Sequence, residues 1–259
     1  MTHQPIWTRP RTIGEPVFIG GHRGASSEAG ENSKEAFEHA VAAGADFIEF
    51  DWRLTHDGMP IVFHDDELQR LYGDERAIGD IDFADLRAID PRIMTVAEAL
   101  ETVRGRISVL LDTKITEPAA LSRGLDLVAP HLGNDTAVAF GTRSLDASEV
   151  VRRRLPESPV LGLFGNPADF PALRAMGGSW ARLWEEHATQ AAIADLQKLG
   201  LKVIIMAGLP TNAGVGVITP QDMHSLLARH PDAVMMNDVR LGLAAREAFP
   251  ATIANSPAG

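Results

Sequence analysis

The chain has 259 residues, of which 45% are hydrophobic and 23% are charged, as in an ordinary soluble globular protein. Its formal net charge of −11 argues against nucleic acid and anionic membrane surfaces as partners, because both require a basic surface. The absence of cysteine excludes disulfides and thiolate metal sites. No run approaches the roughly 18 apolar residues of a membrane span, and the first residues lack the apolar stretch of a secretory signal. We therefore expect a cytoplasmic protein without an integral membrane segment.

Strand-like and helix-like segments alternate along the chain. Helix-length amphipathic segments, several of which begin at Ser, Thr or Asp and end at Gly, separate eight segments typical of strands. Such alternation predicts parallel βαβ units, and a chain of this length then predicts a (β/α)8 TIM barrel. The alternative is an open, doubly wound sheet, which periodicity alone does not exclude. The predicted strands are residues 17–22, 46–54, 107–114, 136–142, 159–164, 179–184, 201–208 and 232–238.

The segment after the second predicted strand is too long and too polar for a simple loop. Residues 60–65, "PIVFHD", predict a short extra strand, and residues 65–94 then predict a small insertion of the kind that sets substrate specificity in barrels. We expect one domain over residues 1–259, with a flexible leader at residues 1–15 and a flexible tail at residues 251–259.

Charged residues gather where the predicted strands end. Side chains two apart on a strand share a face, so Glu49 and Asp51 in "FIEFDWRL" point the same way, as do Asp112 and Lys114 in "SVLLDTK". The carboxyl ends of barrel strands meet at one rim. We therefore expect one rim to carry His22, Arg23, Glu49, Asp51, His64, Asp112 and Lys114.

The residue types at this rim indicate one kind of chemistry. Neighbouring buried carboxylates repel each other unless a cation offsets them, and carboxylate oxygens suit Mg²⁺ or Ca²⁺ better than zinc. Two histidines can serve as general base and general acid, while arginine and lysine bind phosphate oxygens. The set predicts metal-dependent cleavage of a small-molecule phosphodiester.

Each residue also has a structural interpretation. Histidines at strand ends are often only hydrogen-bonded, Glu49 and Asp51 can pair with arginines, and Asp112 can form an ordinary ion pair with Lys114. Convergence at one rim favours the functional interpretation. A glycosidase with two carboxylates is rejected, because it leaves both histidines without roles and places its acids on one strand instead of across a bond.

Residues 21–71, from "GHRGASSEAGENSKEAF" to "HDDELQRL", resemble the opening of glycerophosphodiester phosphodiesterases. The shared features are a His-Arg-Gly, a Glu-Asn before a helix, a Gly-Ala-Asp, a Glu-x-Asp strand and a His-Asp motif. The resemblance continues through "ADLRAID", "TVAEALETV", "LLDTK" and "HPDAVMMNDVRLGLAA" and spans nearly the whole chain.

This resemblance implies a TIM barrel that hydrolyses glycerophosphodiesters to glycerol 3-phosphate and an alcohol. It implies that a glycerol hydroxyl attacks first and that water then opens a cyclic phosphate. Carried over by position, the ligands of one Mg²⁺ or Ca²⁺ are Glu49, Asp51 and Asp112. The base and acid are His22 and His64. The cations that bind phosphate are Arg23 and Lys114, and the glutamate that supports the site is Glu31.

Three departures from the family pattern concern the substrate. Asp112 stands where the family usually has Glu, and an Asp at this position resembles the related sphingomyelinase D enzymes. Met206 stands where an aromatic residue is common. Residues 208–219 are either a lid or a loose connection. Phe140 and Trp184 are further candidates for the pocket wall. The alternative functions are cleavage of a phospholipid headgroup, as by lysophospholipase D or sphingomyelinase D, and a non-catalytic barrel that binds a phosphorylated ligand.

Overall fold

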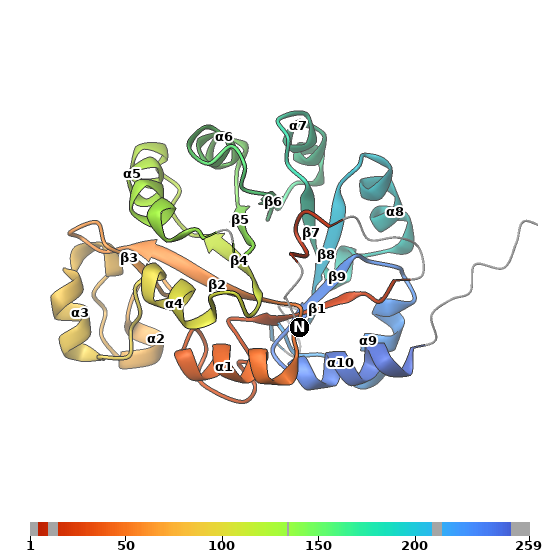
Figure 1. Ribbon diagram of the computed structural model, residues 1–259, viewed down its shortest axis with the longest axis horizontal. Coiled ribbons are helices and arrows are strands. Elements are labelled where there is room, and N and C mark those ends of the chain that lie inside the picture. Colours follow the sequence, from red (N-terminus) through yellow and green to blue (C-terminus); the bar gives the residue numbers. More distant parts are fainter. Residues whose placement is uncertain (1–4, 10–14, 134, 209–213, 250–259) are drawn as a thin grey trace, which may run out of the picture.

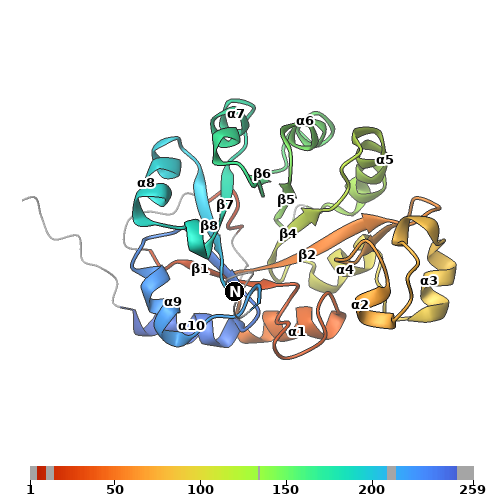
Figure 2. The same cartoon turned by 180° about the vertical axis from the view of Figure 1, so that it is seen from behind.

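The computed structural model describes residues 5–9, 15–133, 135–208 and 214–249. Nine strands form one sheet in the order β1-β9-β8-β7-β6-β5-β4-β2-β3, and β1 also pairs with β2. All pairings are parallel except that of β3 with β2, so the other eight strands close into a barrel and confirm the predicted fold (Figures 1 and 2). The strands are β1 (Phe18–His22), β2 (Phe47–Leu54), β3 (Pro60–Val62), β4 (Ser108–Thr113), β5 (Val138–Thr142), β6 (Val160–Gly162), β7 (Trp180–Trp184), β8 (Lys202–Met206) and β9 (Ala233–Met236).

Helices surround the barrel, and several begin where the sequence predicts. Ser33, Thr95 and Thr189 each accept a backbone N–H of the first helical turn, which stabilises the helix start. The helices are α1 (Lys34–Ala43), α2 (Gln69–Tyr72), α3 (Phe83–Ile89), α4 (Val96–Val103), α5 (Pro118–Val128), α6 (Leu145–Arg154), α7 (Phe170–Ala175), α8 (Gln190–Lys198), α9 (Pro220–Leu227) and α10 (Val239–Ala248). None of these helices combines the length and the apolar character that a membrane crossing requires, over the residues that the structure describes.

Strand β2 shows how alternation builds both the core and the site. Ile48, Phe50 and Trp52 belong to the large cluster that packs between the strands and the helices. Phe47 belongs to a second cluster, which fills the barrel interior with residues such as Trp180. Because side chains two apart share a face, Glu49 and Asp51 point with Phe47 into the barrel, nearer the carboxyl end of the strand.

Residues 5–9 depart from the flexible leader expected for residues 1–15. Trp7 is only 2% exposed, and its ring meets those of Phe47 and Trp180 edge-on, with centroids 5.1 and 5.3 Å away. The backbone oxygen of Trp7 accepts a hydrogen bond of 3.1 Å from Trp180 Nε1. Burial of a large aromatic surface fixes this short segment against the interior cluster. Residues 1–4, 10–14 and the tail at 251–259 lie outside the described residues.

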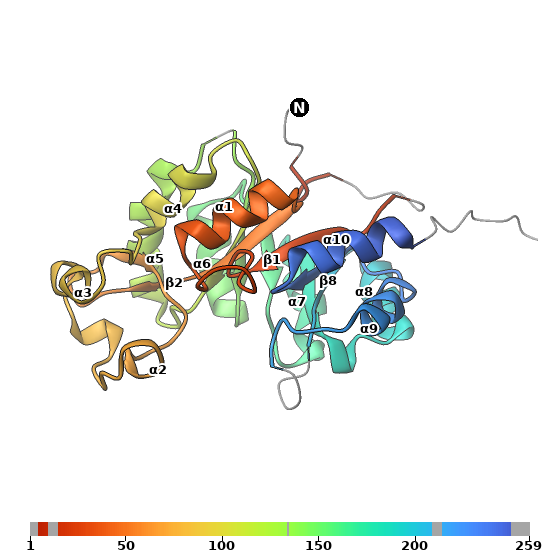
Figure 3. The ribbon, with the colours of Figure 1, turned by 90° about the horizontal axis from the view of Figure 1, so that it is seen from below.

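The segment after β3 folds as a small unit on one side of the barrel (Figure 3). It contains α2, a 3₁₀ turn at Ile78–Asp80 and α3 before the chain enters α4. Its own apolar cluster consists of Ile61, Phe63, Leu68, Ile78, Ile81, Leu86 and Ile93. Because Phe63 belongs to this cluster, the next residue, His64, lies at the border between the insertion and the barrel.

Candidate active site

Three acidic side chains meet at the carboxyl ends of β2 and β4. Asp51 is paired with Asp112 in the strand register, and Glu49 lies two residues before Asp51 on the same face. One carboxylate oxygen from each of the three lies within 4.8 Å of the other two, and all three residues are buried. The predicted convergence of Glu49, Asp51 and Asp112 is therefore present.

Two predicted cations contact this acidic cluster. Lys114 Nζ lies 2.8 Å from Asp51 Oδ1 and 2.7 Å from Asp112 Oδ2. Arg23 Nε lies 3.3 Å from Asp51 Oδ2, and the backbone N–H of Arg23 donates to Glu49 Oε2 at 2.9 Å. Glu49 thus receives a peptide dipole, whereas Asp51 receives two full positive charges.

The difference in partners separates the two carboxyl groups of β2. Burial raises the pKa of Glu49 well above its usual value, and the charges of Asp51 and Asp112 raise it further. Burial also acts to raise the pKa of Asp51, but Lys114 and Arg23 outweigh it and hold that pKa below the usual range. Lys114 and Arg23 therefore offset the effect of burial at Asp51 but not at Glu49.

A hard divalent cation fits this donor set. Oxygen ligands from three carboxylates suit Mg²⁺ or Ca²⁺, and a cation beside Glu49 would stabilise its charged form. Asp51 Oδ1 is buried without a well-directed hydrogen bond, although Lys114 Nζ is close, so it retains capacity for a further ligand. Glu49, Asp51 and Asp112 are the residues that would hold the ion.

His22 is the buried histidine of the site. It ends β1 and is 8% exposed, and its Nδ1 lies 2.8 Å from Asn237 Oδ1. Asn237 Nδ2 donates to the backbone oxygen of Val215 at 3.0 Å, which fixes the amide so that its oxygen faces the ring. His22 Nδ1 therefore carries the proton, and Nε2 has the lone pair in the neutral ring. Burial and the nearby Arg23 lower the pKa of His22 to about 4, so the ring is neutral at neutral pH.

His64 belongs to a chain of charged groups instead. Its Nδ1 lies 2.6 Å from Asp65 Oδ1, and Asp65 Oδ2 accepts from Arg70 Nε at 2.6 Å. Arg70 Nη1 also donates to Glu31 Oε2 at 3.0 Å, and Glu31 Oε1 accepts from Arg23 Nη1 at 2.9 Å. Glu31 thus joins the two arginines, a contact that suits the supporting role that the resemblance implies.

The backbone around Arg23 is unusual in a way that serves the site. Arg23 and Asn32 have positive φ angles of 57° and 56°, which non-glycine residues rarely adopt. These conformations aim the Arg23 N–H at Glu49 and place the Asn32 amide against Asp51. Asn32 Nδ2 donates to Asp51 Oδ2 at 2.9 Å, and the backbone N–H of Asp51 donates to Asn32 Oδ1 at 3.3 Å.

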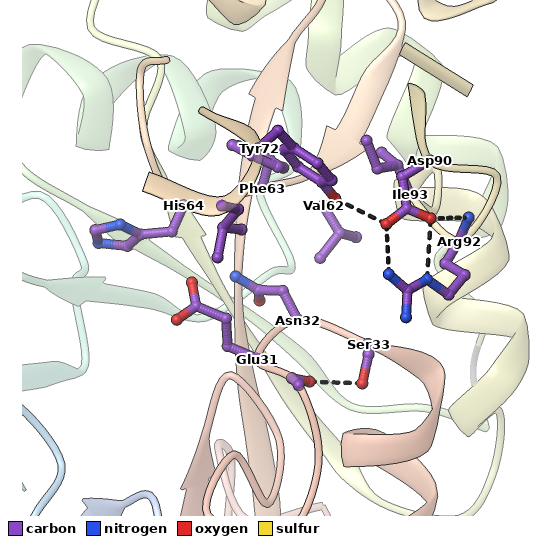
Figure 4. A pocket seen from close by; sticks show the side chains of 12 residues that line it. Glu31, Asn32, Ser33, Val62, Phe63, His64, Tyr72, Asp90, Arg92 and Ile93 are labelled. Atoms are coloured by element: carbon purple, nitrogen blue, oxygen red, sulfur yellow. Dashed lines mark hydrogen bonds and ion pairs between the residues drawn. The ribbon is translucent and has the colours of Figure 1, made fainter. Parts of the chain in front are cut away.

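A pocket of about 210 Å³ opens beside His64, between the insertion and the loop before α1 (Figure 4). His64 and Glu31 lie at one end, and Asp90 lies at the other, where it accepts hydrogen bonds from Tyr72 and Arg92. The wall between these ends is largely apolar. It includes Val62, Phe63, Leu71, Tyr72 and Ile93.

The three candidates for the pocket wall have different positions. Phe140 is fully buried in the cluster between strands and helices, so its ring is not at the rim. Trp184 ends β7 and is half-buried at the edge of the interior cluster, where the Arg182 guanidinium lies 4.1 Å from its ring centroid. Met206 pairs with Trp184 in register and is 2% exposed. In the proposed lid, residues 209–213 lie outside the described residues.

Five residues of the site were not singled out from the sequence. Asn237 and Arg143 directly follow β9 and β5, so reading the residue after every strand would have found both. Asp65 directly follows His64, and Asn32 directly follows Glu31. Arg182 had the weakest signal, because a lone arginine between two tryptophans on a strand has no spacing that indicates a function.

Comparison with known proteins agrees with this geometry. Residues 22–241 match the model of the glycerophosphoryl diester phosphodiesterase family. Lysophospholipase D GDPD3 of Mus musculus is 42% identical over 77 residues, which cover 30% of this chain and 23% of that protein. The glycerophosphodiester phosphodiesterase of Bacillus altitudinis is 33% identical over 108 residues, covering 38% of this chain and 44% of the relative. Both alignments span less than half of the relative's length.

Solved structures share the fold over nearly the whole chain. An Oleispira antarctica phosphodiesterase in complex with the product sn-glycerol-3-phosphate has a TM-score of 0.78 at 20% identity, covering 90% of this chain and 97% of that one. The glycerophosphodiester phosphodiesterase of Thermotoga maritima has a TM-score of 0.73 at 22% identity, covering 89% and 98%. With a family match that includes both histidines and all three acids, this chain belongs to the glycerophosphoryl diester phosphodiesterase family.

Proposed function

We propose that this chain hydrolyses glycerophosphodiesters to glycerol 3-phosphate and an alcohol, with one divalent metal ion and two histidines. The observation that carries the proposal is the meeting of Glu49, Asp51 and Asp112 at a rim that also holds His22 and His64. A protein that only binds a phosphorylated ligand needs the cations of this rim but neither a base nor an acid. The pair of histidines in different surroundings therefore favours turnover.

Glu49, Asp51 and Asp112 would hold Mg²⁺ or Ca²⁺. When bound, such an ion supplies positive charge that stabilises the negative charge developing on the phosphoryl oxygens. Arg23 and Lys114 add to this stabilisation, because each already contacts the acidic cluster and offers donors that suit phosphate oxygens.

His22 has the features of the general base. Its ring is neutral, and its Nε2 has a free lone pair because Nδ1 is held by Asn237. We infer that Nε2 takes the proton of the glycerol hydroxyl next to the phosphate as that oxygen attacks phosphorus. The bond from phosphorus to the other alcohol then breaks, and the first product is a cyclic phosphate.

His64 has the features of the general acid. Asp65 gives its Nδ1 an anionic partner, and Arg70 holds that carboxylate in place. We infer that His64 Nε2 gives its proton to the oxygen of the departing alcohol. In the second step water opens the cyclic phosphate, with the proton transfers running in reverse between the same two rings.

Cleavage of a lysophospholipid headgroup is the second candidate. The relatives named lysophospholipase D and the largely apolar wall of the pocket beside His64 both favour it. An acyl chain would need such a wall, whereas a glycerol or choline group would not.

The test is release of glycerol 3-phosphate from glycerophosphocholine and glycerophosphoethanolamine, with EDTA and after addition of Mg²⁺ or Ca²⁺. Turnover that stops with EDTA and returns with one ion is the expected result. Lysophosphatidylcholine, assayed in parallel for released choline, decides between the two candidates. Turnover that persists in EDTA would contradict the metal requirement, and the absence of turnover of every diester would contradict the proposed function.

A further inference from the structure

Two arginines on the β5–β7 side of the rim have no role in the mechanism above. Arg143 directly follows β5, and Arg182 lies in the middle of β7. Leu163, just beyond β6, joins their surroundings: its N–H donates to the Thr142 oxygen at 2.8 Å, and its oxygen accepts from Arg182 Nη2 at 3.2 Å. Both guanidinium groups therefore reach the same part of the rim, across the barrel mouth from the insertion.

Arg182 is a buried cation with an unused donor. The residue is 6% exposed, and its guanidinium stacks on the Trp184 ring at 4.1 Å. Nη1 is buried and has no hydrogen-bond partner among the residues that the structure describes. Leaving a buried donor unpaired is costly, and native proteins do so rarely. Burial and the neighbouring Arg143 lower the pKa of Arg182 to about 10, so the side chain is charged at neutral pH.

Arg143 adds a second guanidinium that faces the acidic cluster. Its Nε donates to Asp112 Oδ1 at 3.2 Å, and its Nη2 forms a close ion pair with Asp112 Oδ2. Lys114 Nζ shares that Oδ2 at 2.7 Å, so this carboxylate serves two cations. Within the described part of the chain, Arg182 forms no ion pair with a carboxylate. Glu185, the next acid after β7, accepts from the backbone N–H of Gly208 at 2.7 Å. This side of the rim is therefore richer in positive charge than in negative charge, and a metal ion at Asp112 would increase the difference.

We propose that Arg143 and Arg182 form a subsite for a second anionic group of the substrate, a carboxylate or phosphate carried by one alcohol of the diester. This inference rests on the proposed function and narrows its substrate class. The planar fork of a guanidinium matches the oxygens of such groups, and a bound oxyanion would supply the acceptor that Arg182 Nη1 lacks. A trimethylammonium group meets like charge at these arginines, and an uncharged alcohol offers no anionic acceptor.

Glycerophosphoserine and glycerophosphoethanolamine test this directly, because they differ only by one carboxylate. We expect kcat/KM for the serine diester to be about tenfold higher or more, the effect of one added charge-assisted hydrogen bond. In Arg182→Met, kcat/KM should be about the same for the two diesters, whereas Arg182→Lys should keep part of the preference for the serine diester. Arg153→Met, which removes one exposed charge from α6, is the matched control and should keep the full preference.

The outcomes separate this inference from the proposed function. If Arg182 only stabilises the strands, Arg182→Met lowers both rates equally and the preference persists, which overturns the subsite. Equal rates for the two diesters in the unmodified protein overturn it as well, and that measurement does not depend on a variant that folds. Failure to hydrolyse either diester overturns the proposed function and the inference with it.

Discussion

The two histidines of the site lie in opposite surroundings. His22 ends a barrel strand, is 8% exposed and meets the neutral amide of Asn237. His64 follows the short strand β3 at the edge of the insertion, with 32% of its side chain exposed, and meets the carboxylate of Asp65. The same side chain thus has an uncharged partner in one place and an anionic partner in the other.

The role of each ring is therefore set by its hydrogen-bond partner at Nδ1 and not by its position near the rim. An amide oxygen at Nδ1 fixes the tautomer without favouring a charged ring, which suits a base that begins neutral. A carboxylate at Nδ1 orients the ring and places a negative charge beside it, which suits the acid. Changes to either ring or either partner should therefore have different, distinguishable effects.

Replacement of the rings should give the largest effects. His22→Ala and His64→Ala should each lower kcat for glycerophosphoethanolamine by at least roughly 100-fold, as expected for a general base or acid, with unchanged far-UV circular dichroism. A nitrophenyl ester of glycerol 3-phosphate then separates the roles, because its leaving group departs without a proton. In the first turnover, His64→Ala should recover most of its rate of nitrophenolate release from this ester and His22→Ala should not, because the first step then needs only the base. Equal losses on both substrates would contradict the assignment of base and acid.

The pH dependence of kcat/KM tests the neutral state of His22. Its pKa is lowered from 6.5 to about 4 by burial and by Arg23, and a base is active only above its pKa. Activity should therefore persist as the pH falls below 6.5 and should be lost only as the pH approaches 4. In Asn237→Asp a carboxylate would face the ring and raise the pKa of His22, so the loss should begin at a higher pH, with a roughly tenfold lower kcat.

Asn166→Asp adds the same charge at an exposed turn and serves as the control for that variant. Its pH profile should match that of the unmodified protein. If Asn237→Asp loses activity at the same low pH as the unmodified protein, this amide does not set the protonation state of His22.

The sequence predicted the half of the rim that follows β1, β2 and β4. Glu49 and Asp51 interrupt an apolar strand, and this local conflict is visible without a structure because strand alternation is regular. Asn237 was missed although its position after the last strand is equivalent, because one asparagine in "MMNDV" looks like a turn. The burial of Trp7 and the unused donor of Arg182 depend on which strands become neighbours. Such long-range packing has no signature in local periodicity.

The charged partner of His64 should matter less than the ring itself. Asp65→Asn keeps a hydrogen-bond acceptor for Nδ1 but removes the negative charge and one partner of Arg70. We expect kcat for glycerophosphoethanolamine to fall by about tenfold, with little change in the first-turnover rate of nitrophenolate release from the nitrophenyl ester. Asp74→Asn is the control, because it removes a partly exposed carboxylate that pairs with Arg76, two residues away. An equal loss on both substrates would place Asp65 outside the acid step.

The smallest effect should come from a glycine that contacts neither ring. Gly216 has φ +83°, and a Cβ there would lie 2.0 Å from Asn237 Oδ1, the atom that holds His22. Gly214 has φ +84° but open space around its Cβ position. Gly216→Ala and Gly214→Ala should therefore share a backbone strain of about 1 kcal/mol, measured as loss of unfolding free energy. Only Gly216→Ala should also displace the amide, lower kcat by up to about tenfold and move the acid limb. Equal kcat in the two variants would mean that Asn237 can shift without disturbing His22, and the comparison between the histidines would then depend on burial alone.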